Sequence, residues 1–207
     1  MKTFKFAVAF LVFLIIGIWL WRIVSLNNNT PRQTVNTFAV GDTVTYGPNY
    51  NYSVSEDMSG YAVEVLSANV YGYEDYLLKM NIPIESAYTW HPDFLFVVEI
   101  RVFNYDNPAE NGGVIDLIDT YLASSDTRLS ADRELLGKMY PQLGDSPTGF
   151  RIRPGTDMVM NIPFKMDRIA WLYTNDEEEY LRTNSFYLNL TQYPVKQVIK
   201  MKDGDCQ

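Results

Sequence analysis

The stretch that decides the fold reads Phe94-Leu-Phe-Val-Val-Glu-Ile-Arg-Val-Phe-Asn104. Every second residue from Phe96 to Val102 is apolar, whereas Glu99 and Arg101 take the opposite parity. Successive side chains of a strand point to opposite faces, so this period of two predicts a β-strand with one face in a core and the other in water. We expect this strand to be central and to bury Val98 and Ile100.

Similar strand-like runs recur on both sides of this segment, separated by Gly, Pro, Asn and Asp turn signals. They are Thr43–Tyr46, Tyr61–Tyr71, Val114–Leu122, Thr156–Met166, Phe186–Tyr193 and Val195–Met201. Helical patterning is confined to Ala131–Tyr140 and Glu74–Met80, which predict short helices. Because strands and helices do not alternate, a parallel nucleotide-binding sheet is disfavoured. The sequence predicts an all-β fold, with an antiparallel β-sandwich as the simplest architecture.

The N-terminus has the composition of a membrane helix. Residues Phe6 to Trp21 carry no charge, and the apolar run continues past Arg22 to Leu26. At about 1.5 Å per residue, the segment from 6 to 26 spans about 31 Å, close to the thickness of a bilayer hydrocarbon core. A cleaved signal peptide is the alternative, but its usual small-x-small exit is missing here. An uncleaved single-pass anchor is therefore favoured over cleavage.

Charge predicts the orientation of that anchor. Lys2 and Lys5 precede the helix together with the N-terminal amine, against Arg22 alone at the other end. The positive-inside tendency places the N-terminus in the cytoplasm and the C-terminal domain outside the cell membrane. The expected organisation is a cytoplasmic stub and signal anchor over 1–26, a polar stalk over 27–37 and an extracellular domain over 38–207.

The part of the chain after the anchor is acidic. It holds 14 Lys and Arg against 25 Asp and Glu, a formal charge of −11. Such a field repels phosphates, so nucleic acid is not an expected partner. Cys206 is the only cysteine, which excludes an intrachain disulfide and leaves burial to hold the domain together.

Several strand patterns carry a family resemblance. The strand ending at Asn104, the turn Ser125–Leu129, the segment Arg153-Pro-Gly-Thr156 and the run Met160–Phe164 are similar to those of the bacterial membrane-anchored, telokin-like immunoglobulin domains of unknown function. The resemblance extends from residue 61 to residue 193, and it departs from the pattern at Asn161-Ile162, where such domains often have a Gly-x-Val step. It implies an immunoglobulin-like antiparallel β-sandwich on an extracytoplasmic tether, and it transfers no catalytic residues.

Catalytic and metal signatures are weak. The chain has one histidine and lacks a Gly-x-Ser-x-Gly elbow, so neither a nucleophilic triad nor a structural zinc site is expected. Asp176–Glu179 is a run of four acids without the spaced ligands of a calcium loop, and a solvated acidic loop is favoured over a calcium site. We expect no cofactor, no metal and no enzyme activity.

Aromatic residues leave two binding interpretations open. Two aromatic sets could stack on sugars, although core and cross-strand packing is favoured: Tyr46, Tyr50, Tyr52 and Tyr61, or Tyr71, Tyr73 and Tyr76 with Tyr88 and Trp90. The segment with Tyr88, Trp90 and His91 lacks a strand period and is the candidate binding loop. The predicted function is a membrane-tethered, extracytoplasmic, non-catalytic interaction module for an unknown protein or cell-wall polymer. The alternative is a cell-surface hydrolase that uses paired carboxylates on the β-sandwich, which requires two acids about 5–10 Å apart in a cleft.

Overall fold

The structure is a computed structural model. It describes residues 2–29, 33–53, 58–84, 91–108, 114–144, 147–167, 170–171, 174 and 176–205. The chain divides into two compact units, residues 1–33 and residues 34–207.

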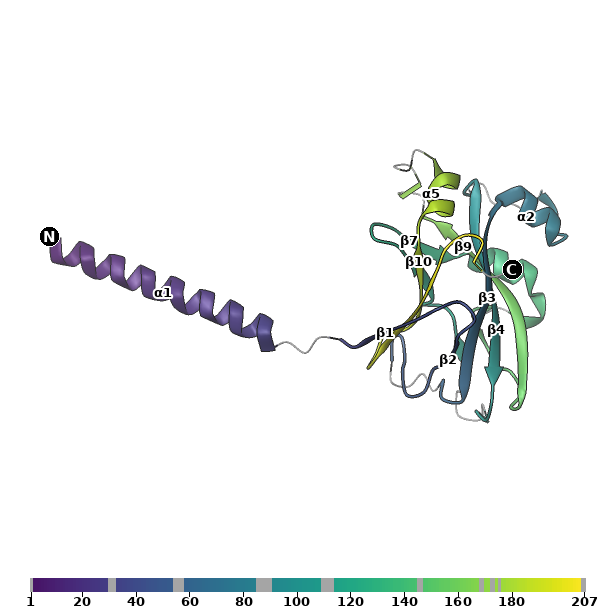
Figure 1. Ribbon diagram of the computed structural model, residues 1–207, viewed down its shortest axis with the longest axis horizontal. Coiled ribbons are helices and arrows are strands. Elements are labelled where there is room, and N and C mark those ends of the chain that lie inside the picture. Colours follow the sequence, from purple (N-terminus) through teal and green to yellow (C-terminus); the bar gives the residue numbers. More distant parts are fainter. Residues whose placement is uncertain are drawn as a thin grey trace. The chain divides into compact units, whose positions relative to one another are not determined.

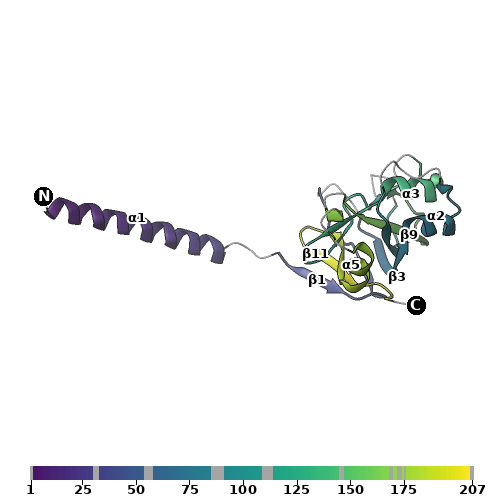
Figure 2. The ribbon, with the colours of Figure 1, turned by 90° about the horizontal axis from the view of Figure 1, so that it is seen from above.

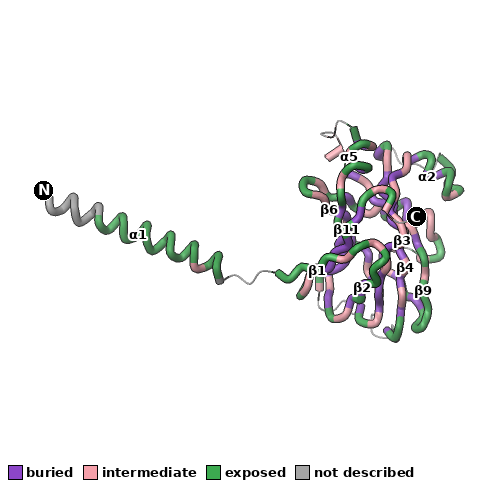
Figure 3. Tube along the Cα trace, viewed as in Figure 1, coloured by how far each residue is buried: buried purple, intermediate pink, exposed green. Residues whose placement is uncertain are grey.

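The first unit is a single helix, α1 (Lys2–Asn29). Its side chains from Phe10 to Asn28 lie almost entirely exposed, and Figure 3 shows this described part of the helix in green. Phe10–Asn28 is long and apolar enough to cross a bilayer. The expected apolar N-terminal helix is therefore present, as needed for a single-pass anchor.

The second unit is built on one nine-stranded sheet (Figure 1). The strands of this sheet follow one another in the order β1 (Val35–Phe38), β11 (Lys196–Met201), β10 (Phe186–Thr191), β6 (Tyr121–Ala123), β7 (Arg128–Ala131), β9 (Thr156–Met166), β4 (Phe94–Asn104), β3 (Tyr61–Gly72) and β2 (Thr43–Thr45). A small separate sheet pairs β5 (Ile115–Asp116) with β8 (Gly149–Phe150). Neighbouring strands are antiparallel except β1 and β11, which run parallel, so the sheet is mixed.

The large sheet curls until its two edges approach each other. Its edge strands β1 and β2 are joined by residues 39–42 alone. Gln197 on β11 donates from Nε2 to the Thr45 carbonyl of β2 at 3.0 Å, and Asn51 donates from Nδ2 to the Leu190 carbonyl at 2.9 Å. Tyr50 and Tyr193 add an antiparallel bridge across the same gap. The sheet is thus nearly a barrel, closed at its seam by side-chain and bridge hydrogen bonds.

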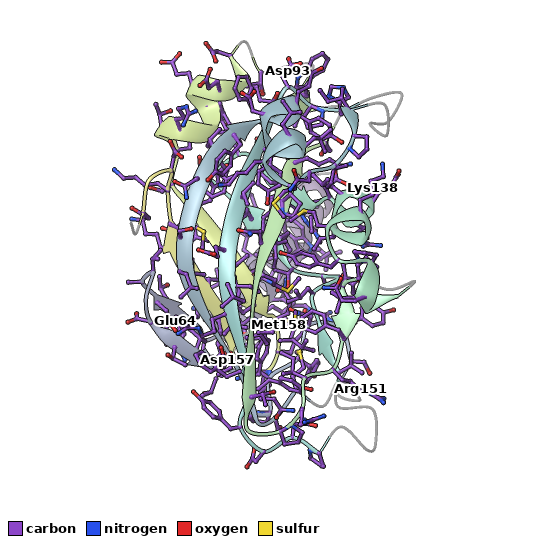
Figure 4. All side chains as sticks on the ribbon, turned by 90° about the vertical axis from the view of Figure 1, so that its right-hand side faces the viewer. Glu64, Asp93, Lys138, Arg151, Asp157 and Met158 are labelled. Carbon is purple, nitrogen blue, oxygen red and sulfur yellow. The ribbon has the colours of Figure 1, made fainter. Side chains whose placement is uncertain are left out.

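The core lies inside this curl, seen as the purple interior of the domain in Figure 3. β4 is an inner strand between β3 and β9, and Figure 4 shows it running from Asp93 at one end of the domain to the region of Glu64 and Asp157 at the other. Val98 and Ile100 are buried, as the strand period predicts. Glu64 and Asp157 both approach Arg101 on the outer face, at 3.9 and 3.5 Å.

Short helices cover the outside of the sheet. α2 (Tyr73–Lys79) and α3 (Arg133–Met139) lie on one side of the domain in Figure 2, and a 3-10 helix, η2 (Pro141–Leu143), follows α3. Tyr76 and Leu77 of α2 and Leu135 of α3 pack with Leu95 and Val97 in a second core. This second core buries the outward-facing residues at the start of β4. α5 (Glu177–Thr183) lies at the same end of the domain as α2 in Figure 1.

The domain is mostly β, and the two predicted short helices are present, but the predicted antiparallel β-sandwich is not confirmed. The nine strands of the large sheet pair continuously, because β6 bonds to both β10 and β7, so this sheet does not divide into the two facing sheets of a sandwich. β1 adds the parallel pair. Val35 to Thr37, assigned to the stalk from the sequence, lie in β1, and the folded unit starts at Thr34.

Candidate functional site

The predicted binding loop is described at one residue only. Tyr88 and Trp90 lie outside the described residues. His91 is half-buried, and its ring stacks on Tyr73 of α2 with 4.3 Å between centroids and 9° between planes. Its Nδ1 lies 2.9 Å from the Pro92 carbonyl oxygen. His91 therefore packs against Tyr73, and both residues line a depression of about 240 Å³.

The tyrosines that the sequence set apart differ widely in burial. Tyr46 and Tyr61 lie in the main core, and Tyr73 and Tyr76 lie in the second core. Burial raises the pKa of the Tyr46 hydroxyl well above its usual range, so that this group stays neutral. Tyr52, by contrast, is 85% exposed. Core packing is confirmed for the four buried tyrosines, and Tyr52 requires a different explanation.

Tyr52 lies on a groove of about 350 Å³, which we call the tyrosine groove. Its lining comes from four separate stretches of sequence: Asn51, Tyr52, Asp119, Tyr121, Arg128, Gln192 and Tyr193. Tyr193 is 53% exposed and Tyr121 half-buried, so three tyrosine side chains line one depression. Ligand pockets are typically a few hundred Å³ with aromatic walls and a few polar groups.

The seam of the barrel holds one wall of the groove in place. Tyr50 donates its N–H to the Tyr193 carbonyl at 2.6 Å, and the N–H of Tyr193 returns a bond to the Tyr50 carbonyl at 2.8 Å. The rings of Tyr50 and Tyr193 pack with their centroids 5.9 Å apart. Asn51 is buried and donates to the Leu190 carbonyl. These bonds hold the backbone just before Tyr52 and at Tyr193, and both tyrosine side chains are exposed to solvent.

The hairpin of β6 and β7 supplies the other wall. Ala123 is paired with Arg128, so Tyr121 and Arg128 are diagonal neighbours on one face of the hairpin. The Arg128 guanidinium carbon lies 3.9 Å from the centroid of the Tyr121 ring. Gln192 donates from Nε2 to the Tyr121 hydroxyl at 3.0 Å. Stacking and this hydrogen bond together hold the Tyr121 ring and align the plane of the guanidinium.

A larger groove, of about 550 Å³, runs between α5 and the β6–β7 turn. Its polar groups are already engaged with one another. Tyr180 donates to Asp126 at 2.6 Å, and the Ser124 hydroxyl lies 2.8 Å from the Tyr180 hydroxyl. The hydrogen bond from Tyr180 lowers the pKa of the Asp126 carboxyl, which therefore stays ionised and is unsuited to act as a general acid.

The acidic run at Asp176–Glu179 begins a helix, and the expected acidic loop is wrong. Asp176 accepts the N–H of Glu179 at 2.8 Å as the N-cap of α5, and acids in the first turn suit the helix dipole. Asp176 and Glu179 line the larger groove. Within the described ranges, no group of three or more His, Cys, Asp or Glu residues could hold a metal ion.

Glu177 is the unusual acid of α5. Its side chain is buried and accepts the N–H of Asp93 at 3.1 Å through Oε2, while Oε1 has no hydrogen-bond partner among the residues that the structure describes. Burial raises the pKa of the Glu177 carboxyl to about 7. The carboxyl faces the start of β4, and it ties α5 to that strand. Sequence patterns single out neither Glu177 within the acidic run nor the joint use of Tyr121, Arg128 and Tyr193.

Comparison with known proteins places most of the chain in a family. Residues 35–197 match the family model described as a domain of unknown function (DUF5028). No curated protein and no solved structure matches the chain. The matched segment begins at the first residue of β1 and includes every lining residue of the tyrosine groove.

Proposed function

This chain belongs to the DUF5028 family, and from that premise we propose that it is a membrane-tethered binding module whose ligand is held by the tyrosine groove. The observation that carries the proposal is the exposure of Tyr52 and Tyr193, at 85% and 53%, on the lining of a groove that also contains Arg128 and Asp119. Among the described residues of the folded unit, the other exposed large aromatic side chains are Tyr105 and Tyr187, which do not line the groove. Tyr and Arg are among the residues that dominate binding interfaces. A rigid backbone beneath exposed tyrosines lowers the entropy lost on binding.

The tether and its orientation belong to the same proposal. α1 supplies an apolar span, and the distribution of Lys2, Lys5 and Arg22 favours a cytoplasmic N-terminus. The folded unit would then lie outside the membrane, as in the telokin-like immunoglobulin domains that the strand patterns resemble. In that compartment the ligand would be a cell-wall polymer or a surface protein, and the negative charge of the domain disfavours nucleic acid.

A hydrolase that uses paired carboxylates is the second candidate. Glu177 favours it, because a carboxyl group with a pKa of about 7 suits a general acid. The geometry favours the binding module, since Glu177 is 7% exposed and its Oε2 is already bound to the backbone of Asp93.

Co-sedimentation of the full chain in nanodiscs with purified bacterial cell walls tests the binding module. We expect the wild-type chain to sediment with the walls. The double variant Tyr52→Ala/Tyr193→Ala should bind at least about tenfold more weakly, because aromatic anchors carry most of an interface's affinity. Tyr105→Ala is the matched control, since Tyr105 is 55% exposed and lies outside the groove.

Equal sedimentation of the double variant and the control would place binding elsewhere. Release of soluble wall fragments by the wild-type chain, lost in Glu177→Gln, would instead support the hydrolase.

A further inference from the structure

Arg128 is the first of two charged groups in the tyrosine groove that lack an ionic partner. Among the residues that the structure describes, its only close interaction is the stack on Tyr121, and it forms no salt bridge. A guanidinium presents five N–H donors in a planar fork that matches a carboxylate. The guanidinium lies over the Tyr121 ring, with its carbon 3.9 Å from the centroid, and this contact holds it at the groove before any ligand arrives. Arg128 is thus prepared to receive an anionic, planar group.

Asp119 is the second charged group in the groove. It lies in the turn before β6, and it is half-buried on the groove wall. Its carboxylate makes no hydrogen bond or ion pair with any residue in the described part of the chain, Arg128 included. Partial burial of a carboxylate costs free energy, which an ion pair with a cation offsets. An ammonium group forms such a charge-assisted hydrogen bond.

Both charges open on one depression between exposed tyrosines, so a ligand of matching polarity would satisfy the two together. We infer that the tyrosine groove binds a short zwitterionic peptide, with the free carboxylate on Arg128 and an ammonium group near Asp119. The tyrosine rings would cover the apolar parts of the peptide between its charged groups. This inference rests on the proposed function, and it names the chemical class of that ligand.

The charge pattern separates this ligand from a neutral glycan. A glycan could stack on Tyr52 and Tyr193 and still leave Arg128 and Asp119 without ionic partners. A peptide with one end blocked would satisfy only one of the two charges. Of these three ligands, only the zwitterionic peptide provides an ionic partner for both Arg128 and Asp119.

Calorimetric titration of the full chain in detergent micelles with trialanine tests the inference. N-acetyl-trialanine lacks the ammonium group, trialanine amide lacks the carboxylate, and chitotriose is the neutral glycan. We expect trialanine to bind and each blocked peptide to bind about fivefold more weakly, since ion pairs in a half-exposed groove are moderate. Chitotriose should bind more weakly still.

Charge-neutral variants identify which residue reads which end of the peptide. Arg128→Gln should remove the preference for trialanine over its amide and retain the preference over the acetylated peptide. Asp119→Asn should remove the preference for trialanine over the acetylated peptide and retain the preference over the amide. Tyr105→Ala should keep both preferences.

The possible failures are distinguishable. Binding of chitotriose with no response to trialanine would overturn the zwitterion inference and leave the groove as a binding site. Equal affinities for all three peptides would also overturn it. Binding of none of these probes, together with loss of sedimentation on cell walls, would overturn the proposed function as well.

Discussion

Two sets of tyrosines in the same domain have opposite surroundings. Tyr46, Tyr61 and Tyr76 are enclosed by strands and helices and are about 1% exposed or less, whereas Tyr52 and Tyr193 project into water from a hydrogen-bonded seam. The same side chain therefore stabilises the fold in one region and is exposed to solvent in the other. The comparison shows that abundance of tyrosine says little by itself, because the burial of each ring decides what it does.

The largest loss of stability is expected from a substitution in the core at Val98. This residue is fully buried on β4, between β3 and β9. Val98→Asp should unfold the domain, since an unpaired buried charge costs several kcal/mol against a total stability of about 5–15 kcal/mol. Circular dichroism of the full chain in detergent should show loss of the β signal. A cooperative melt at the wild-type temperature would contradict the assignment of this face to the core.

The next largest effect is expected when one buried tyrosine and one exposed tyrosine are each replaced by alanine. Tyr61→Ala removes a fully buried ring from the main core and should cost about 3–5 kcal/mol of unfolding free energy. Tyr52→Ala removes a ring that is 85% exposed and should change the unfolding free energy by less than about 0.5 kcal/mol. Urea unfolding of both variants measures the difference. Similar losses from the two would show that Tyr52 serves the fold.

The strong strand patterns allowed much of the fold to be predicted. β4 and β9 have the bounds that their alternating residues indicate, because long half-buried strands carry their own period. β1 was missed, since Val35-Asn-Thr-Phe38 has a polar composition and becomes a strand only through its pairing with β11. β7 was missed because it has four residues, too few for a period to show.

The candidate site was much harder to predict. Its lining comes from residues 51–52, 119–121, 128 and 192–193, which only the closure of the barrel brings together. Tyr52 falls in a set of tyrosines for which the sequence favours core packing over sugar stacking. No local pattern links Tyr52 with Arg128, since sequence spacing does not encode the seam of a curled sheet.

A smaller effect is expected from Glu177, which belongs to the buried side of the comparison. Its folded-state pKa, about 7, is raised above the ordinary value of 4.5 because the side chain is buried. The unfolded chain therefore loses this proton first, and stability should fall as pH rises from about 4.5 to 7, by about 1–3 kcal/mol. Urea unfolding across this range measures it. Glu177→Gln should flatten that part of the profile, and an unchanged profile would contradict the assignment.

The most direct test of the central claim asks which tyrosines a ligand covers. Hydroxyl-radical footprinting of the full chain in nanodiscs, with and without bacterial cell walls, reports the exposure of each tyrosine by mass spectrometry. The binding module predicts that oxidation of Tyr52 and Tyr193 falls on binding, while oxidation of Tyr105, exposed outside the groove, stays the same. Bound chain with unprotected Tyr52 and Tyr193 would contradict the account.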